Sequence, residues 1–455
     1  MTSRACLAVA ATLLLMAACD ASDPSSNGND QGDAGVNATP DAAPDATAPP
    51  PCMGIACNQV ACAATARPPT TLSGVVYAPN GTLPLHGVTV YVPTAAIEPF
   101  SEGVSCDRCD APLAGAPLVQ TTTDTSGHFS LENVPANIDV PLVIQVGRWR
   151  RQIVVPQVAE CADTPLDAEV TRLPRNQSEG ELPRMALTTG GSDALECLLR
   201  KIGIDDTEFT TAGGAGRVHL YAGAGGANKF DAAHGGTSFA AAQPFWSSLD
   251  SLKKYDVVFL SCEGGQHAEA KPAAALQAMH DFADLGGRVF AEHWHNYWIQ
   301  QGPAPWPDTM TFHFQADLDD ITADIDQSFD GGMALAAWMV AVGGSSTLGK
   351  IALTSTQHTL DSVNPDYTDE WIGLAQTASG TPSVQYASFT TPLTVDEGER
   401  CGKLVFSDMH VASGDVSRTS TPFPGGCTSV GLSPQEKALA FMVFDIASCV
   451  GPPIE

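Results

Sequence analysis

The segment from residue 184 to residue 292 alternates short apolar runs with amphipathic stretches, and this alternation constrains the fold more than any other feature. Buried-strand patterns occur at 184–188, 217–221, 256–261 and 288–292, and helical patterns at 193–202, 244–252 and 272–285. Strands that alternate with helices favour a mostly parallel sheet with both faces covered. In such a sheet the ligand crevice lies beyond the carboxyl ends of the strands, so the residues that follow each strand are candidates for a site.

Residues 70–173 show a different pattern, in which short alternating runs are broken by turns such as Asn80-Gly81 and Ser126-Gly127. Period-two alternation between such turns is typical of antiparallel strands. The spacing LSGVVYAPNGTLPLHGVTVYV…TTTDTSGHFSLENVP resembles the carboxypeptidase regulatory-like, transthyretin-like β-sandwich. The resemblance implies an all-β module and says little about function.

The first 19 residues read MTSRACLAVAATLLLMAAC, and the apolar run from Leu7 to Met16 is too short to span a bilayer. This pattern predicts an export signal over residues 1–18. The ending LMAAC resembles a bacterial lipoprotein signal, which implies lipidation of Cys19; a plain secretory signal is the alternative. We therefore expect a lipid-anchored protein of the bacterial cell envelope, on the periplasmic face of the outer membrane or at the cell surface.

The segment 19–69 is predicted to be a tether that ends in a small collar of Cys52, Cys57 and Cys62. Residues 20–51 contain no Lys or Arg and almost no apolar side chains to bury. The free energy gained by burial would therefore not offset the entropy lost on ordering them. The whole chain has 51 acidic and 22 basic residues and a formal net charge of -29. This balance excludes a general basic surface for nucleic acid or anionic headgroups, and leaves the lipid as the membrane contact.

The cysteine count indicates disulfides and one free thiol. Of 13 cysteines, one lies in the signal and Cys19 would carry lipid, which leaves eleven in an oxidising compartment. Because eleven is odd, one cysteine has no partner, and Cys262 is the best candidate for it.

The pair Cys106 and Cys109 has the CxxC spacing of a redox dithiol or of half a zinc site. No second CxxC and no nearby His completes a metal quartet, so structural disulfides are favoured. Cys449 is expected to pair with Cys427 or Cys401.

Cys262 and His410 both follow predicted strands of the α/β region, the second at the end of LVFSDMHV. Taken alone, they suggest a Cys–His nucleophile pair in which the thiolate attacks and the imidazole moves the proton.

The order KKYDVVFLSCEGG, a helix, and then GGRVFAEHWHNYW resembles the class I glutamine amidotransferase-like superfamily. The resemblance implies a flavodoxin-like α/β domain over residues 183–450, after a linker at 174–182, with Gly264 and Gly265 as the oxyanion turn. It places the nucleophile position at His293, where covalent acyl chemistry lacks a thiol. A His there, with a later strand that ends in His410, is most similar to the ThuA-like branch, which is associated with sugar metabolism and with binding rather than cleavage.

The predicted crevice combines imidazoles, a carboxylate and an indole. Its candidate ligand-binding residues are Gly264, Gly265, Glu292, His293, Trp294, His295 and His410. His293 and His295 are two residues apart, so on a continuing strand both would face one way and could seat a divalent metal; hydrogen bonding or packing is the alternative. No cofactor is firmly implied. Trp294 is either part of a core cluster or a stacking platform for a sugar ring.

The sequence thus predicts a multidomain protein, with an all-β sandwich followed by a mostly parallel α/β domain. The preferred function is binding of a carbohydrate or peptide ligand in a crevice that has no cysteine nucleophile and is non-catalytic or weakly catalytic. One alternative is a hydrolase that uses Cys262 and His410 or a His-bound metal, and another is a structural or adhesion scaffold.

Overall fold

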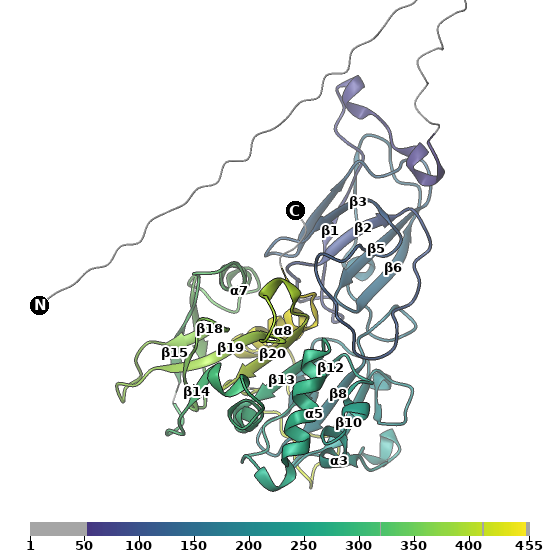
Figure 1. The fold of residues 1–455 in the computed structure, drawn as a ribbon. Coiled ribbons are helices and arrows are strands. Elements are labelled where there is room, and N and C mark those ends of the chain that lie inside the picture. The colour runs from purple at the N-terminus through teal and green to yellow at the C-terminus, as the bar shows by residue number, and fades with distance from the viewer. Residues whose placement is uncertain (1–51, 319, 412–413, 452–455) are drawn as a thin grey trace, which may run out of the picture. The chain divides into compact units, whose positions relative to one another are not determined.

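A computed structural model of the chain describes residues 52–451 except 319, 412 and 413 (Figure 1). The predicted export signal, the lipidation at Cys19 and the tether up to residue 51 lie outside the described residues. Within the described part, no helix is both long and apolar enough to cross a membrane.

Residues 71–165 form two small sheets. One has four antiparallel strands in the order β3 (Pro117–Thr122), β2 (Thr89–Pro93), β5 (Val140–Val146), β6 (Trp149–Val155). The other has the order β4 (His128–Glu132), β1 (Thr71–Val75), β7 (Asp163–Pro165). Leu72, Val90 and Ile144, which come from both sheets, belong to one buried cluster. The two sheets therefore share apolar packing, which is the main source of stability for such small elements.

The remaining strands form one mixed sheet, with eleven strands among the described residues. Its parallel part consists of β9 (Phe209–Thr211), β11 (Ala240–Ala241), β10 (Val218–Ala222), β8 (Met185–Thr189), β12 (Val257–Leu260), β13 (Arg288–Glu292) and β20 (Gly402–Ser407). The strands predicted between residues 184 and 292 all lie in this part, because helices connect them and parallel pairing needs such crossovers.

The expectation of a mostly parallel sheet is incomplete, because four antiparallel strands extend the sheet beyond β20, although they precede β20 in the chain. It consists of β19 (Ser383–Thr391), β18 (Thr368–Leu374), β15 (Ile321–Ile325) and β16 (Lys350–Leu353). A separate pair is β14 (Met310–Phe312) with β17 (Leu360–Val363). The connection between β18 and β19 carries no helix, and strands joined in this way pair antiparallel.

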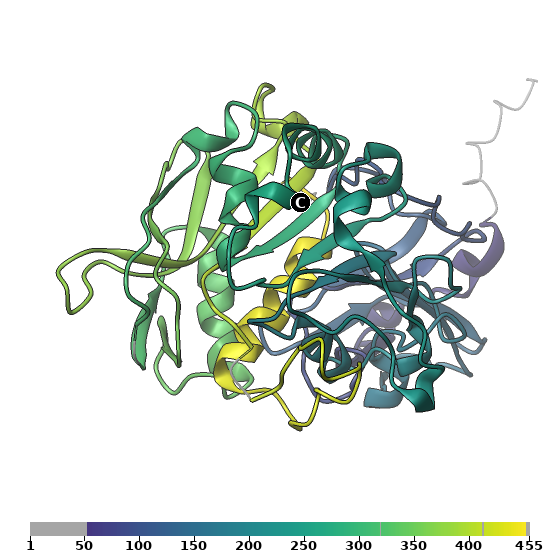
Figure 2. The same ribbon diagram turned by 90° about the horizontal axis from the view of Figure 1, so that it is seen from below.

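Alternate residues of the central strands pack into different clusters. In β12, Val257 and Phe259 belong to one cluster and Val258 and Leu260 to another, since successive side chains point to opposite faces. The first cluster includes α2 (Leu195–Lys201), α7 (Asp330–Ala341) and α8 (Pro434–Ala447); the second includes α3 (Ala242–Trp246), α4 (Leu249–Leu252), α5 (Ala273–Asp284) and α6 (Tyr297–Gln300). The sheet is thus covered on both faces; the yellow helix in Figure 2 is α8. A short helix, α1 (Ala168–Thr171), precedes the large sheet.

Five disulfides join the described cysteines, and Cys262 is the one free cysteine among them, as the sequence predicted. The pairs are Cys52–Cys57, Cys62–Cys161, Cys106–Cys401, Cys109–Cys449 and Cys197–Cys427. The expected pairing of Cys449 with Cys427 or Cys401 is wrong. The segment between β2 and β3 runs beside the C-terminal residues instead, where Cys109 N donates to Val450 O at 3.0 Å.

Removing the Cys109–Cys449 bridge with Cys109→Ser/Cys449→Ser should lower the free energy of unfolding by about 2 to 4 kcal/mol. The reason is that the bridge closes a long loop of the unfolded chain and so reduces the entropy of the unfolded state. Its cysteines are 340 residues apart, whereas Cys52 and Cys57 are 5 apart. Denaturant titration of both double serine variants checks this, with the Cys52–Cys57 pair as the control. Equal losses in the two variants would contradict the loop-closure explanation.

Candidate functional site

Cys262, His293 and His410 lie together beyond the carboxyl ends of three adjacent strands, β12, β13 and β20. One donor atom from each residue lies within 4.8 Å of the other two. Cys262 Sγ is 3.5 Å from His293 Nδ1, and the ring centroids of His293 and His410 are 5.4 Å apart. The structure thus brings together the thiol and the two imidazoles that the sequence had placed after separate strands.

The two imidazoles of this cluster have opposite electrostatic surroundings. Burial lowers the pKa of His293 to about 3, and the nearby His410 and His295 add to the effect. Burial alone would also lower the pKa of His410, but its interaction with Cys262 and the charge of Asp193 raise this pKa to about 9. At neutral pH, His293 is therefore a neutral imidazole, and His410 is an imidazolium beside the sulfur of Cys262.

His293 begins a tight turn directly after β13. Its φ is +40°, in the left-handed region that residues other than glycine seldom adopt. The next residues form the 3₁₀ helix η6 (His293–Asn296), so the strand does not continue past Glu292. Backbone strain of this kind is concentrated at functional sites.

This turn separates His295 from His293, so the two do not face one way as expected. His295 is fully buried, and its Nε2 lies 2.9 Å from the carbonyl oxygen of Ser261. Its Nδ1 accepts a hydrogen bond from Trp298 Nε1 at 3.0 Å. Both ring nitrogens of His295 therefore already have partners, whereas the ring of His293 lies against Cys262 and His410.

The other predicted crevice residues differ in exposure. Gly264 is exposed in the turn after Cys262, with φ +76°, and Gly265 beside it is half-buried. Glu292 is fully buried, and its Oε2 accepts the backbone N–H of Cys262 at 3.2 Å. This hydrogen bond holds the backbone at the start of the turn that carries the thiol.

Trp294 connects the cluster to the surface. Its ring centroid lies 4.9 Å from that of His293 and 4.7 Å from that of Phe314, on which it stacks at 19°. Phe314 is 48% exposed. Sequence reasoning did not single out Phe314, because a phenylalanine that follows Phe312 and precedes an acidic segment gives no pattern that marks a site.

A buried ion pair holds the turn that follows Cys262. Lys271 Nζ lies 2.6 Å from Glu263 Oε2 and also donates to the carbonyl of Gln266 at 2.7 Å. The other Glu263 oxygen accepts the backbone N–H of Ala224 at 2.8 Å. No pattern in the sequence indicates this pair, because a lysine just before a helix normally lies in solvent.

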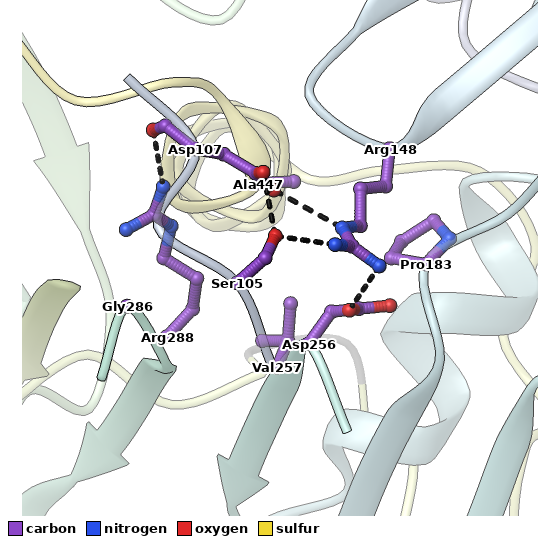
Figure 3. Close-up of a pocket in the computed structure, with 9 residues that line it drawn as sticks. All are labelled: Ser105, Asp107, Arg148, Pro183, Asp256, Val257, Gly286, Arg288 and Ala447. Carbon is purple, nitrogen blue, oxygen red and sulfur yellow. Dashed lines mark hydrogen bonds and ion pairs between the residues drawn. The ribbon is translucent and has the colours of Figure 1, made fainter. Parts of the chain in front are cut away.

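The small cavity of Figure 3 is a separate feature at the other end of β12. Its volume of about 10 Å³ leaves room for roughly one water. Arg148 occupies it with two ion pairs, to Asp256 at 2.9 Å and to Asp107 at 3.0 Å. Arg288, which also lines the cavity, donates to the carbonyl oxygens of Asp107 and Ser448 at 3.4 and 3.1 Å. The charged groups of the cavity therefore have partners within the protein, and the cavity is part of the packing between the small sheets and the large one.

The comparisons assign no family to the chain. No protein-family model matches it, and the comparison with curated proteins gives no match. A solved ThuA-like protein of Bacteroides uniformis is 11% identical, with a TM-score of 0.31, over 57% of this chain and 89% of that one. A cohesin–X-dockerin complex of Acetivibrio cellulolyticus, mutated at its N-terminal interface, is 16% identical, with a TM-score of 0.17, over 30% and 85% of the two chains.

Helix α2 carries a buried carboxyl group, Glu196, which is 1% exposed. Burial raises its pKa to about 7, although a hydrogen bond from Ser417 acts in the opposite direction, and the charges of Asp193 and Asp415 add to the increase. The folded protein therefore holds a proton here that the unfolded chain releases at lower pH.

Replacing this group with Glu196→Gln should raise the free energy of unfolding at pH 8 by roughly 3 kcal/mol. The reason is that the native pKa exceeds the unfolded one, so the native state loses stability as pH rises from about 4.5 to above 7. At pH 4 both states are protonated, and the gain should be close to zero. Denaturant titrations at the two pH values measure the difference, and an equal gain at both would contradict this assignment.

Proposed function

We propose that the protein binds a divalent transition-metal ion through Cys262 Sγ and the imidazoles of His293 and His410. The observation that carries this proposal is the convergence of the three donor atoms within 4.8 Å. One thiolate and two neutral imidazoles form a ligand set that Zn²⁺ accepts, and three protein ligands leave the fourth position open. Binding would release the proton that His410 holds in the metal-free protein, because only a neutral imidazole can be a ligand. The preference of thiolates for borderline and soft ions favours zinc over magnesium or calcium.

The burial of the cluster favours a metal over a covalent acyl reaction. Cys262 is 0% exposed and His293 is 5% exposed. In an acyl reaction the carbonyl carbon of the substrate must come within bonding distance of the sulfur. A sulfur that is buried in this way leaves no room for the rest of the substrate. A metal ion needs only the space between the three donors and one open position.

The open position would take an oxygen atom of a carbohydrate or peptide ligand, which the metal would bind and polarise. We place this activity at the bacterial cell envelope, with the lipid on Cys19 as the membrane anchor and a transthyretin-like sandwich beside an amidotransferase-like α/β domain. The five disulfides support an oxidising compartment. The export-like leader supports the same location.

Purified protein equilibrated with Zn²⁺ and then dialysed should retain about one ion per chain, as expected for a single three-ligand site. Cys262→Ser and His410→Ala should each reduce affinity by more than the roughly 10- to 100-fold that loss of an outer-shell partner costs. His313→Ala is the matched control, because this His lies outside the cluster and its side chain is 66% exposed. Metal analysis and competition with a chromophoric chelator give both quantities, and full occupancy in Cys262→Ser would refute the site.

A second candidate, a thiol hydrolase, is supported by the raised pKa of His410 next to Cys262, which is typical of a thiolate–imidazolium pair. The metal proposal predicts that metal-free protein hydrolyses p-nitrophenyl acetate no faster than its Cys262→Ser variant. It also predicts that bound zinc slows the reaction of Cys262 with iodoacetamide. Ester hydrolysis that depends on Cys262 and is inhibited by zinc would favour the hydrolase.

A further inference from the structure

Two buried carboxyl groups, Asp193 and Glu292, lie next to the cluster of Cys262, His293 and His410. Glu292 is fully buried and Asp193 is 6% exposed. Each of the two accepts a hydrogen bond from a backbone N–H group beside the cluster. Neither is one of the three clustered donor residues.

Each carboxyl group holds the backbone of a donor residue or of its neighbour. Glu292 Oε2 accepts the N–H of Cys262 at 3.2 Å, and Glu292 itself precedes His293 in the chain. The two oxygens of Asp193 accept the N–H of Val411, the residue after His410, at 3.0 and 3.1 Å.

The loop that carries Asp193 also contacts the turn at Cys262. Ser192 N donates to the carbonyl oxygen of Cys262 at 3.0 Å. Gly190 packs so closely on this turn that a Cβ there would lie 2.1 Å from the same oxygen. Cys262 is therefore held through both its N–H and its carbonyl group.

We infer that Asp193 and Glu292 are positioning residues, whose hydrogen bonds with backbone N–H groups fix the three donor residues relative to one another. The inference rests on the proposed metal site for its function, although the geometry of the pair does not. Without these hydrogen bonds, the three donor residues would lie on separate loops after neighbouring strands, and each loop could move without the others. The pair connects the loop after β8 to the ends of β12, β13 and β20.

A glutamine at position 292 can keep the contact with the turn at Cys262, because its amide oxygen accepts the N–H of Cys262 as the carboxyl oxygen does.

The test uses the full chain and four variants. Zn²⁺ affinity, measured by competition with a chromophoric chelator, should fall about 10- to 100-fold in Glu292→Leu and in Asp193→Ala, the range typical of outer-shell partners. Glu292→Gln should stay within about threefold of the unchanged protein, because its amide oxygen keeps the hydrogen bond from the N–H of Cys262. Glu196→Gln is the control, because it removes a nearby buried carboxyl that touches none of the three donors.

A second measurement does not require metal. In zinc-free protein, Cys262 should react with iodoacetamide about tenfold faster or more in Glu292→Leu and Asp193→Ala, because the turn that buries its sulfur is released. If Glu292→Leu does not fold, Asp193→Ala decides alone, and amide hydrogen exchange of Cys262 and Val411 in Glu292→Gln should match the unchanged protein.

The outcomes separate the two proposals. If the unchanged protein takes up no zinc, the metal site is refuted, while the alkylation rates still decide the positioning role. Folded Glu292→Leu and Asp193→Ala proteins with unchanged alkylation rates would overturn the inference, and so would a loss in Glu292→Gln as large as that in Glu292→Leu.

Discussion

Parallel pairing of β12, β13 and β20 is the constraint on which the site depends. Parallel strands end at the same edge of a sheet, so the residues after them meet even though 148 residues separate Cys262 from His410 in the chain. The tight turn at His293 and the carboxyl pair of Asp193 and Glu292 then convert this proximity into a cluster of three donors. Any change that shifted the register of β13 would separate the donors without touching them.

Much of the large sheet could be predicted from the sequence, because its strands are short, fully buried and separated by helices. The free thiol followed from an odd count of cysteines, and Cys262 is the one free cysteine among the described residues. The antiparallel extension was not predicted, because strands such as β15 and β16 are 5 and 4 residues long and bury only two side chains each, too few to establish a period.

The arrangement of the site was harder to predict, because it depends on what happens after each strand ends. The His293 and His295 spacing implied a shared face only if the strand continued, and the positive φ of His293 ends it. Glu263, Lys271 and Asp193 act through contacts between loops that are far apart in the chain. Such contacts leave no periodic pattern in a single sequence.

The Cys106–Cys401 and Cys109–Cys449 bridges have a consequence for the survival of the chain in a protease-rich environment. Both bridges begin in the segment between β2 and β3. One joins Cys106 to Cys401, directly before β20, and the other joins Cys109 to Cys449, just after α8. Cleavage of an exposed loop between residues 109 and 401 would therefore nick the polypeptide without releasing either fragment. The pieces that carry Cys262, His293 and His410 would stay covalently attached to the small sheets as long as the bridges remained oxidised.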